Sequence, residues 1–77
     1  MARMNHEKLP KEARPDKGGT YTVAHNGREL YRAEIVKYGG GCWATVRIVD
    51  PLAMAGDPSF AAGTQFDLRV AMYEFLA

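Results

Sequence analysis

The sequence of 77 residues contains little cysteine and no long apolar run. Because Cys42 is the only cysteine, an internal disulfide is excluded and a reducing cytoplasm is favoured over secretion. No stretch approaches the roughly 18 apolar residues of a membrane span, and the first residues lack the apolar core of a signal peptide. We therefore expect a cytoplasmic protein that does not enter the membrane.

Side chains that carry enzyme chemistry are also scarce. His6 and His25 are the only histidines, and alternation places Cys42 inside, where its thiol cannot act as a nucleophile. A metal site needs roughly three or four converging ligands, and no such spacing is present. Gly39-Gly40-Gly41 lacks the following Lys and Ser or Thr of a phosphate-binding loop. The sequence predicts no catalytic residue, no metal site, no cofactor and no enzymatic activity.

Charge divides the chain into two parts. Five basic and three acidic residues give residues 1–19 a net charge of +2, whereas the remainder carries −1. The first part also holds two prolines, Gly18-Gly19 and too few apolar side chains to offset the entropy of ordering. We expect a disordered N-terminal arm over residues 1–19 and one small domain over residues 20–77. The arm is either a solvated leader or a basic tail that contacts phosphates.

A hairpin is predicted at Asn26-Gly27, because both residues tolerate the positive φ of a two-residue type I′ turn. The turn pairs Val23 with Leu30 and Tyr21 with Arg32. In the second strand, however, the better apolar set is Tyr31, Ala33 and Ile35, which points to the opposite face from Leu30. A bulge or a strong bend in this strand reconciles the two patterns.

The same segment has a helical alternative. Asn26 can serve as an N-cap, Glu29 as its capping-box partner and Gly39 as the residue just past a helix over residues 27–38. We favour the strand over residues 28–38, because Tyr31 and Ile35 are β-formers and the next segment needs a neighbour for pairing.

From Cys42 to Val49, residues of two kinds alternate along a predicted strand. The inward set is Cys42, Ala44, Val46 and Ile48, and the outward set is Trp43, Thr45, Arg47 and Val49. An outward indole beside Arg47 offers contact area, a ring face and a charge, so Trp43 is the best single candidate for a binding residue. The alternative is structural, with Trp43 covering a sheet edge or packing in a dimer interface.

The C-terminal third begins with a loop over residues 51–63 that is long for a hairpin connection. A short helical turn fits Pro51 to Ala55, and Phe60 can pin the loop to the body of the domain. Phe66, Leu68, Val70 and Met72 then recur at period two, which predicts a strand, although a helix from Asp67 is the alternative. A last short strand fits residues 73–76 after a tight turn.

Five short strands with a bent second strand and a tight turn before the last resemble the SH3-like small barrel. The strand with Val23 and His25, the Gly41 to Ala44 segment with Trp43, and the Gly63, Gln65, Phe66, Asp67 run before Val70 are similar to the C-terminal dimerisation domain of plasmid ParB-family repressors such as KorB. This resemblance implies an all-β, five-stranded antiparallel barrel and self-association as a dimer. The chain departs from that family in its longer 52–63 loop and in lacking a DNA-binding part.

Two functions are compatible with these features. The first is a non-enzymatic binding or dimerisation module that holds a protein partner through Trp43, Arg47 and Tyr21 or through a sheet edge. The second is nucleic-acid contact, with Arg32, Arg47, Arg69 and the basic arm on phosphates and with Trp43 or Tyr31 stacked on bases. The net acidic body favours the first. The small size also suits an accessory protein of a bacterium or a mobile element.

Overall fold

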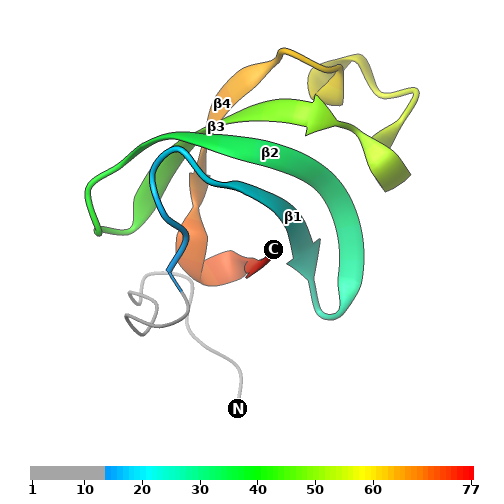
Figure 1. Cartoon of the computed structure of the whole chain (residues 1–77). Helices are drawn as coiled ribbons and strands as arrows, with labels where there is room; N and C mark the ends of the chain where they lie inside the picture. Colours follow the sequence, from blue (N-terminus) through cyan, green and yellow to red (C-terminus); the bar gives the residue numbers. More distant parts are fainter. Residues whose placement is uncertain (1–13) are drawn as a thin grey trace.

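The structure, a computed structural model, describes residues 14–77. Within that range the chain forms β-strands and short 3-10 turns but no α-helix (Figure 1). The strands are β1 (Thr20–His25), β2 (Arg28–Tyr38), β3 (Trp43–Asp50), β4 (Gln65–Arg69) and β5 (Glu74–Leu76). No helix in the described part of the chain is long and apolar enough to cross a membrane.

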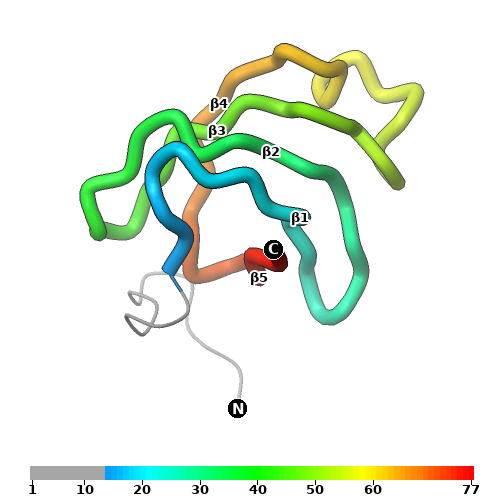
Figure 2. Tube along the Cα trace, in the orientation of Figure 1, coloured from blue at the N-terminus to red at the C-terminus, as the bar shows by residue number. Residues whose placement is uncertain are grey.

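These strands form one five-stranded antiparallel sheet in the order β4-β3-β2-β1-β5. The sheet curls along the bent β2, and the chain turns sharply between β4 and β5 (Figure 2). The prediction of a five-stranded antiparallel all-β domain is confirmed, but the closed barrel is wrong. The 3-10 turn η4 (Val70–Met72) ends β4, and the three residues of β5 pair with β1, so the described strands leave the sheet open.

The predicted hairpin at Asn26-Gly27 is confirmed, and the helical alternative for residues 27–38 is wrong. Asn26 has a φ of 52° and Gly27 a φ of 81°, the left-handed values that a type I′ turn requires. His25 and Arg28 face each other directly across this turn.

A β-bulge near the turn sets which side chains of β2 point inward. Ala24 pairs with Glu29 but Val23 pairs with Tyr31, so Leu30 is the extra residue. The predicted bulge is therefore confirmed, whereas the predicted pairing of Val23 with Leu30 is wrong. Two further register shifts between β2 and β3 fit the bending of the long strand.

The core lies on the concave side of the sheet. Its fully or nearly buried apolar members are Val23, Tyr31, Ala33, Ile35, Ala44, Val46, Ile48, Leu68 and Val70. The period-two pattern of β3 is confirmed for Ala44, Val46 and Ile48, but Cys42 is only partly buried rather than a core residue. Cys42 precedes the first residue of β3 and adjoins the glycine connection, so less of the sheet covers it.

The long connection between β3 and β4 contains two 3-10 turns, η2 (Leu52–Met54) and η3 (Pro58–Phe60). The first lies within the helical turn expected at residues 51–55. Phe60 packs on the core as expected, with its ring centroid 5.4 Å from that of Tyr31 and 5.8 Å from that of Phe66. The strand pattern predicted through Met72 stops earlier, because Met72 belongs to η4 and is 39% exposed.

Residues before β1 also bond to the sheet. The backbone N–H of Gly18 donates to the carbonyl of Ile35 at 2.8 Å, and the N–H of Ile35 donates to the carbonyl of Gly19 at 2.9 Å. Tyr21 accepts a hydrogen bond from the Asp16 N–H at 2.9 Å. The end of the predicted arm thus contacts the sheet, while residues 1–13 of that prediction lie outside the described residues.

Gly27→Ala should lower the free energy of unfolding by about 1 to 2 kcal/mol, because a side chain is strained at positive φ. No atom lies within 4 Å of an added Cβ at this position, so the cost comes from the backbone alone. Gly39→Ala is the matched control, since its surroundings are equally open and its φ lies outside the left-handed region. Urea unfolding of both variants checks this, and an equal loss in the two would contradict the turn geometry.

Candidate functional site

The face of the sheet opposite the core carries the candidate site, here named the outer face. The registers join Glu34 with Arg47 and Gln65, Lys37 with Thr45 and Asp67, and Trp43 with Arg69 across β2, β3 and β4. These eight side chains define the outer face. Each lies one position from a residue that points into the core or packs against it, because successive side chains of a strand alternate between faces.

Trp43 is the largest exposed side chain of this face, with 54% of its surface accessible. The guanidinium carbon of Arg69, its cross-strand neighbour, lies 4.8 Å from the centre of the indole ring. A cation over an exposed aromatic ring contributes about 0.5 to 1 kcal/mol. Arg69 therefore helps to fix the orientation of the indole while more than half of it stays accessible.

A shallow pocket adjoins the indole at the start of β3. Its lining includes Lys37, Tyr38, Trp43, Thr45 and Asp67. Thr45 Oγ1 donates to Asp67 Oδ1 at 2.6 Å, and the Tyr38 hydroxyl donates to the carbonyl of Gly41 at 3.2 Å. The pocket thus combines two aromatic rings with one ammonium and one carboxylate, a mixture suited to a peptide-like surface.

Arg47, also predicted as a binding residue, lies on the outer face and forms an ion pair. Its Nη1 is 3.4 Å from Glu34 Oε1, and both side chains are more than a third exposed, at 46% and 40%. Exposed pairs of this kind contribute about 0 to 1 kcal/mol. The pair is weak enough to be exchanged for contacts with a partner.

The remaining predicted site residues do not all share this face. Arg32 lies on the same side of β2 as Glu34 but outside the eight residues of the outer face, and its Nη1 donates to Thr22 Oγ1 of β1 at 2.7 Å. Tyr31 is only 3% exposed and belongs to the core, so it is not available for stacking on a base. Tyr21 packs against the core and Phe75, because the bulge pairs it with Ala33 instead of Arg32. The structure brings together Trp43, Arg47 and Arg69, but not Tyr21 or Tyr31.

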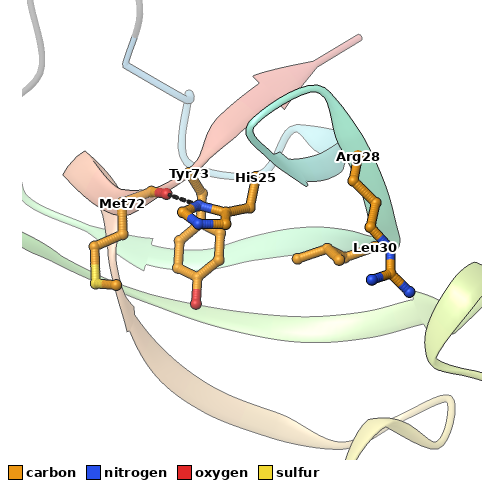
Figure 3. Close-up of a pocket in the computed structure, with 5 residues that line it drawn as sticks. All are labelled: His25, Arg28, Leu30, Met72 and Tyr73. Carbon is orange, nitrogen blue, oxygen red and sulfur yellow. Dashed lines mark hydrogen bonds between the residues drawn. The ribbon is translucent and has the colours of Figure 1, made fainter. Parts of the chain in front are cut away.

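A second pocket lies at the tip of the β1–β2 hairpin, and sequence reasoning missed it (Figure 3). It is lined by His25, Arg28, Leu30, Met72 and Tyr73. His25 Nδ1 lies 2.9 Å from the carbonyl oxygen of Met72, and a carbonyl only accepts, so Nδ1 carries the proton. The Gly27 N–H donates to Glu74 Oε1 at 3.3 Å. These contacts join residues 47 positions apart, for which the sequence has no local signal.

Among residues 14–77, no three or more His, Cys, Asp or Glu side chains gather in a way that could hold a metal ion.

Comparisons with known proteins add no relative. No family model matches the chain, and neither a curated protein nor a solved structure matches it. The likeness to plasmid repressor domains therefore stays a prediction, and the functional argument depends on the geometry of the outer face.

The phenol of Tyr31 has an altered acidity. Burial raises the pKa of Tyr31 above its usual value near 10, because desolvation disfavours the phenolate, and the neighbouring Tyr73 adds to the rise. The pKa of Tyr38 is raised as well, first by burial and then by Cys42, against a lowering effect of Arg14. The raised pKa of Tyr31 makes folding stability depend on pH.

Tyr31→Phe should weaken the loss of stability at high pH. Because the pKa of Tyr31 is raised on folding, the contribution of its neutral phenol to the free energy of unfolding is complete below the unfolded pKa near 10. This contribution declines as the pH rises further. The decline is up to about 1.4 kcal/mol per pH unit. Urea unfolding at pH 8, 10 and 11 measures the difference between the wild type and Tyr31→Phe. A difference that does not change with pH would contradict the burial of this phenol.

Proposed function

We propose that this chain is a non-enzymatic protein-binding module and that its outer face contacts the partner, with Trp43 as the main contact residue. The observation that carries the proposal is the indole that is 54% exposed and covered on one ring face by Arg69. An exposed indole adds little to the core of the domain. Tryptophan and arginine are, however, among the residues that contribute most to binding energy in protein interfaces.

The position of the indole favours a protein partner. Trp43 belongs to a β-strand and contacts Arg69, so the indole is already partly ordered. Binding of a partner therefore costs little side-chain conformational entropy at this residue. Exchangeable polar contacts, the Thr45–Asp67 hydrogen bond and the Glu34–Arg47 pair, lie further along the same face. Aromatic residues and arginine are enriched in protein interfaces, and polar groups are common at the rim, so this combination suits a protein partner.

The charges of this face support protein over nucleic acid. Lys37, Arg47 and Arg69 are interspersed with Glu34 and Asp67, and Glu34 pairs with one of the cations. A phosphate backbone selects a continuous basic surface, whereas mixed charges suit another protein. In addition, Tyr31, one of the two aromatic residues considered for base stacking, is buried.

The partner is either a second copy of this chain or a different protein. Self-association is what the likeness to plasmid repressor domains implies, and it is one outcome of the experiment below. We also propose a cytoplasmic location, because a chain with a single cysteine cannot form an internal disulfide, which fits a reducing compartment.

Trp43→Ala should weaken partner binding at least about tenfold, as the loss of a tryptophan that dominates an interface does. Unfolding free energy should change by less than about 1 kcal/mol, because the side chain is largely exposed. Val49→Ala is the matched control, since Val49 lies on the same strand and is 51% exposed. Its partner affinity should equal that of the wild type.

The measurement uses the full chain and both variants as bait in lysate of the source cell. A captured protein is purified, and its affinity is measured by calorimetry, with sedimentation velocity as the test of self-association. Equal binding by Trp43→Ala and the wild type would contradict the proposal. Tight binding to an oligonucleotide that weakens steeply with salt would favour the nucleic-acid alternative instead.

A further inference from the structure

Among residues 14–77, strand β4 forms one end of the sheet and pairs with a strand, β3, on one side only. It spans five residues without proline, whereas β5, at the other end, spans three. An edge strand of this kind presents backbone groups on which a further strand can form. The edge of β4 is thus the longer of the two edges that the open sheet leaves.

Two hydrogen bonds reveal which residues of β4 face this edge. The Ile48 N–H donates to the carbonyl of Thr64 at 2.8 Å, and the Val70 N–H donates to the carbonyl of Cys42 at 2.9 Å. In an antiparallel ladder every second residue bonds to the neighbour, and the register between these bonds is regular. Phe66 and Leu68 therefore bond to β3, and the N–H and C=O groups of the alternate residues, such as Gln65 and Asp67, point outward.

The side chains along the edge differ between the two faces of the sheet. Gln65, Asp67 and Arg69 lie on the outer face, and Phe66 and Leu68 lie on the core side. Phe66 is only partly buried, with its ring 5.9 Å from that of Tyr31. A strand that pairs with β4 therefore needs charged side chains of complementary sign on the outer face and apolar side chains on the core side.

We propose that the edge of β4 takes up an extended segment of a different protein as a sixth, antiparallel strand. An acidic residue of the segment lies opposite Arg69 and a basic residue opposite Asp67, with apolar residues opposite Leu68 and Phe66. Read from its N-terminus, the segment is acidic, apolar, basic, apolar and polar. This inference rests on the proposed protein-binding function and names the kind of partner that the neighbouring edge selects.

Charge complementarity argues against a second copy of β4 as the occupant. Pairing over all five residues places Asp67 directly opposite Asp67 of the copy, which is unfavourable. A shift that pairs Asp67 with Arg69 places Ala71 opposite Gln65, and Ala71 lies in η4, where the strand has ended. The shifted register keeps only three residues of each strand. A different protein avoids both defects.

The test is an NMR titration of the full chain with two synthetic peptides. One has the sequence Ser-Glu-Val-Lys-Val-Thr-Ser, and the other exchanges its glutamate and lysine. The wild type should prefer the first by about threefold to tenfold, the effect of two cross-strand charge pairs. The amides of Gln65 and Asp67 should shift and become protected from hydrogen exchange.

Charge reversal in the protein provides the decisive comparison. Asp67→Lys combined with Arg69→Glu should reverse the peptide preference. Asp67→Asn combined with Arg69→Gln keeps the shape of both side chains and should bind the two peptides equally. The second double variant also keeps the test valid if the first one does not fold.

Several outcomes would overturn the inference. They are absence of binding up to millimolar peptide, an unchanged preference in both double variants, shifts away from β4, or a dimer of the chain paired through β4. A purified partner that requires Trp43 while leaving the β4 amides unchanged would refute the edge proposal alone. A partner whose affinity is unchanged by Trp43→Ala, but which protects the β4 amides from exchange, would refute the outer-face proposal and support strand addition at β4.

Discussion

The rest of the structure depends on the phase of β2, that is, on which alternate residues of this strand point into the core. One extra residue, Leu30, at the bulge beside the hairpin turn places Tyr31, Ala33 and Ile35 in the core. Because β3 pairs with β2 and β4 pairs with β3, this phase extends across the sheet and leaves Trp43 and Arg69 outside. A one-residue change in register would exchange the two faces and bury the charged side chains. The candidate surface is therefore a consequence of the same geometry that forms the core.

The outer face and the edge of β4 are two parts of one region. Arg69 contacts the indole of Trp43 and also lies on the edge strand, so both surfaces share this side chain. A strand added to β4 would lie two strands from the indole, with Arg69 of β4 between them. The charges of Asp67 and Arg69 also restrict which strands can pair, and natural edge strands use such charges against unspecific association. Selective recognition and protection of the edge thus have the same physical origin.

Local signals in the sequence predicted the strands, but not the register between distant strands or the residue at which β4 ends. The Asn26-Gly27 turn, the need for a bulge in β2 and the inward and outward sets of β3 follow from φ preferences and period-two alternation. The contact of Arg69 with Trp43 depends on the register between β3 and β4, two strands that a long loop separates in the sequence. The closed barrel was wrong as a prediction because the period-two pattern continues through Met72, whereas β4 ends at Arg69 and the tight turn comes earlier, at η4. Tyr21 was placed on the wrong face for a related reason, since the exact position of the bulge decides its neighbour.

The most direct test of the account is iodide quenching of tryptophan fluorescence, because Trp43 is the only tryptophan of the chain. With the indole 54% exposed on the outer face, the account predicts emission typical of a hydrated indole and ready quenching in the native protein. In protein that sedimentation velocity shows to be monomeric, emission at short wavelength that iodide does not quench would contradict it, because the indole would then lie inside the domain and the assignment of the two faces of the sheet would be wrong.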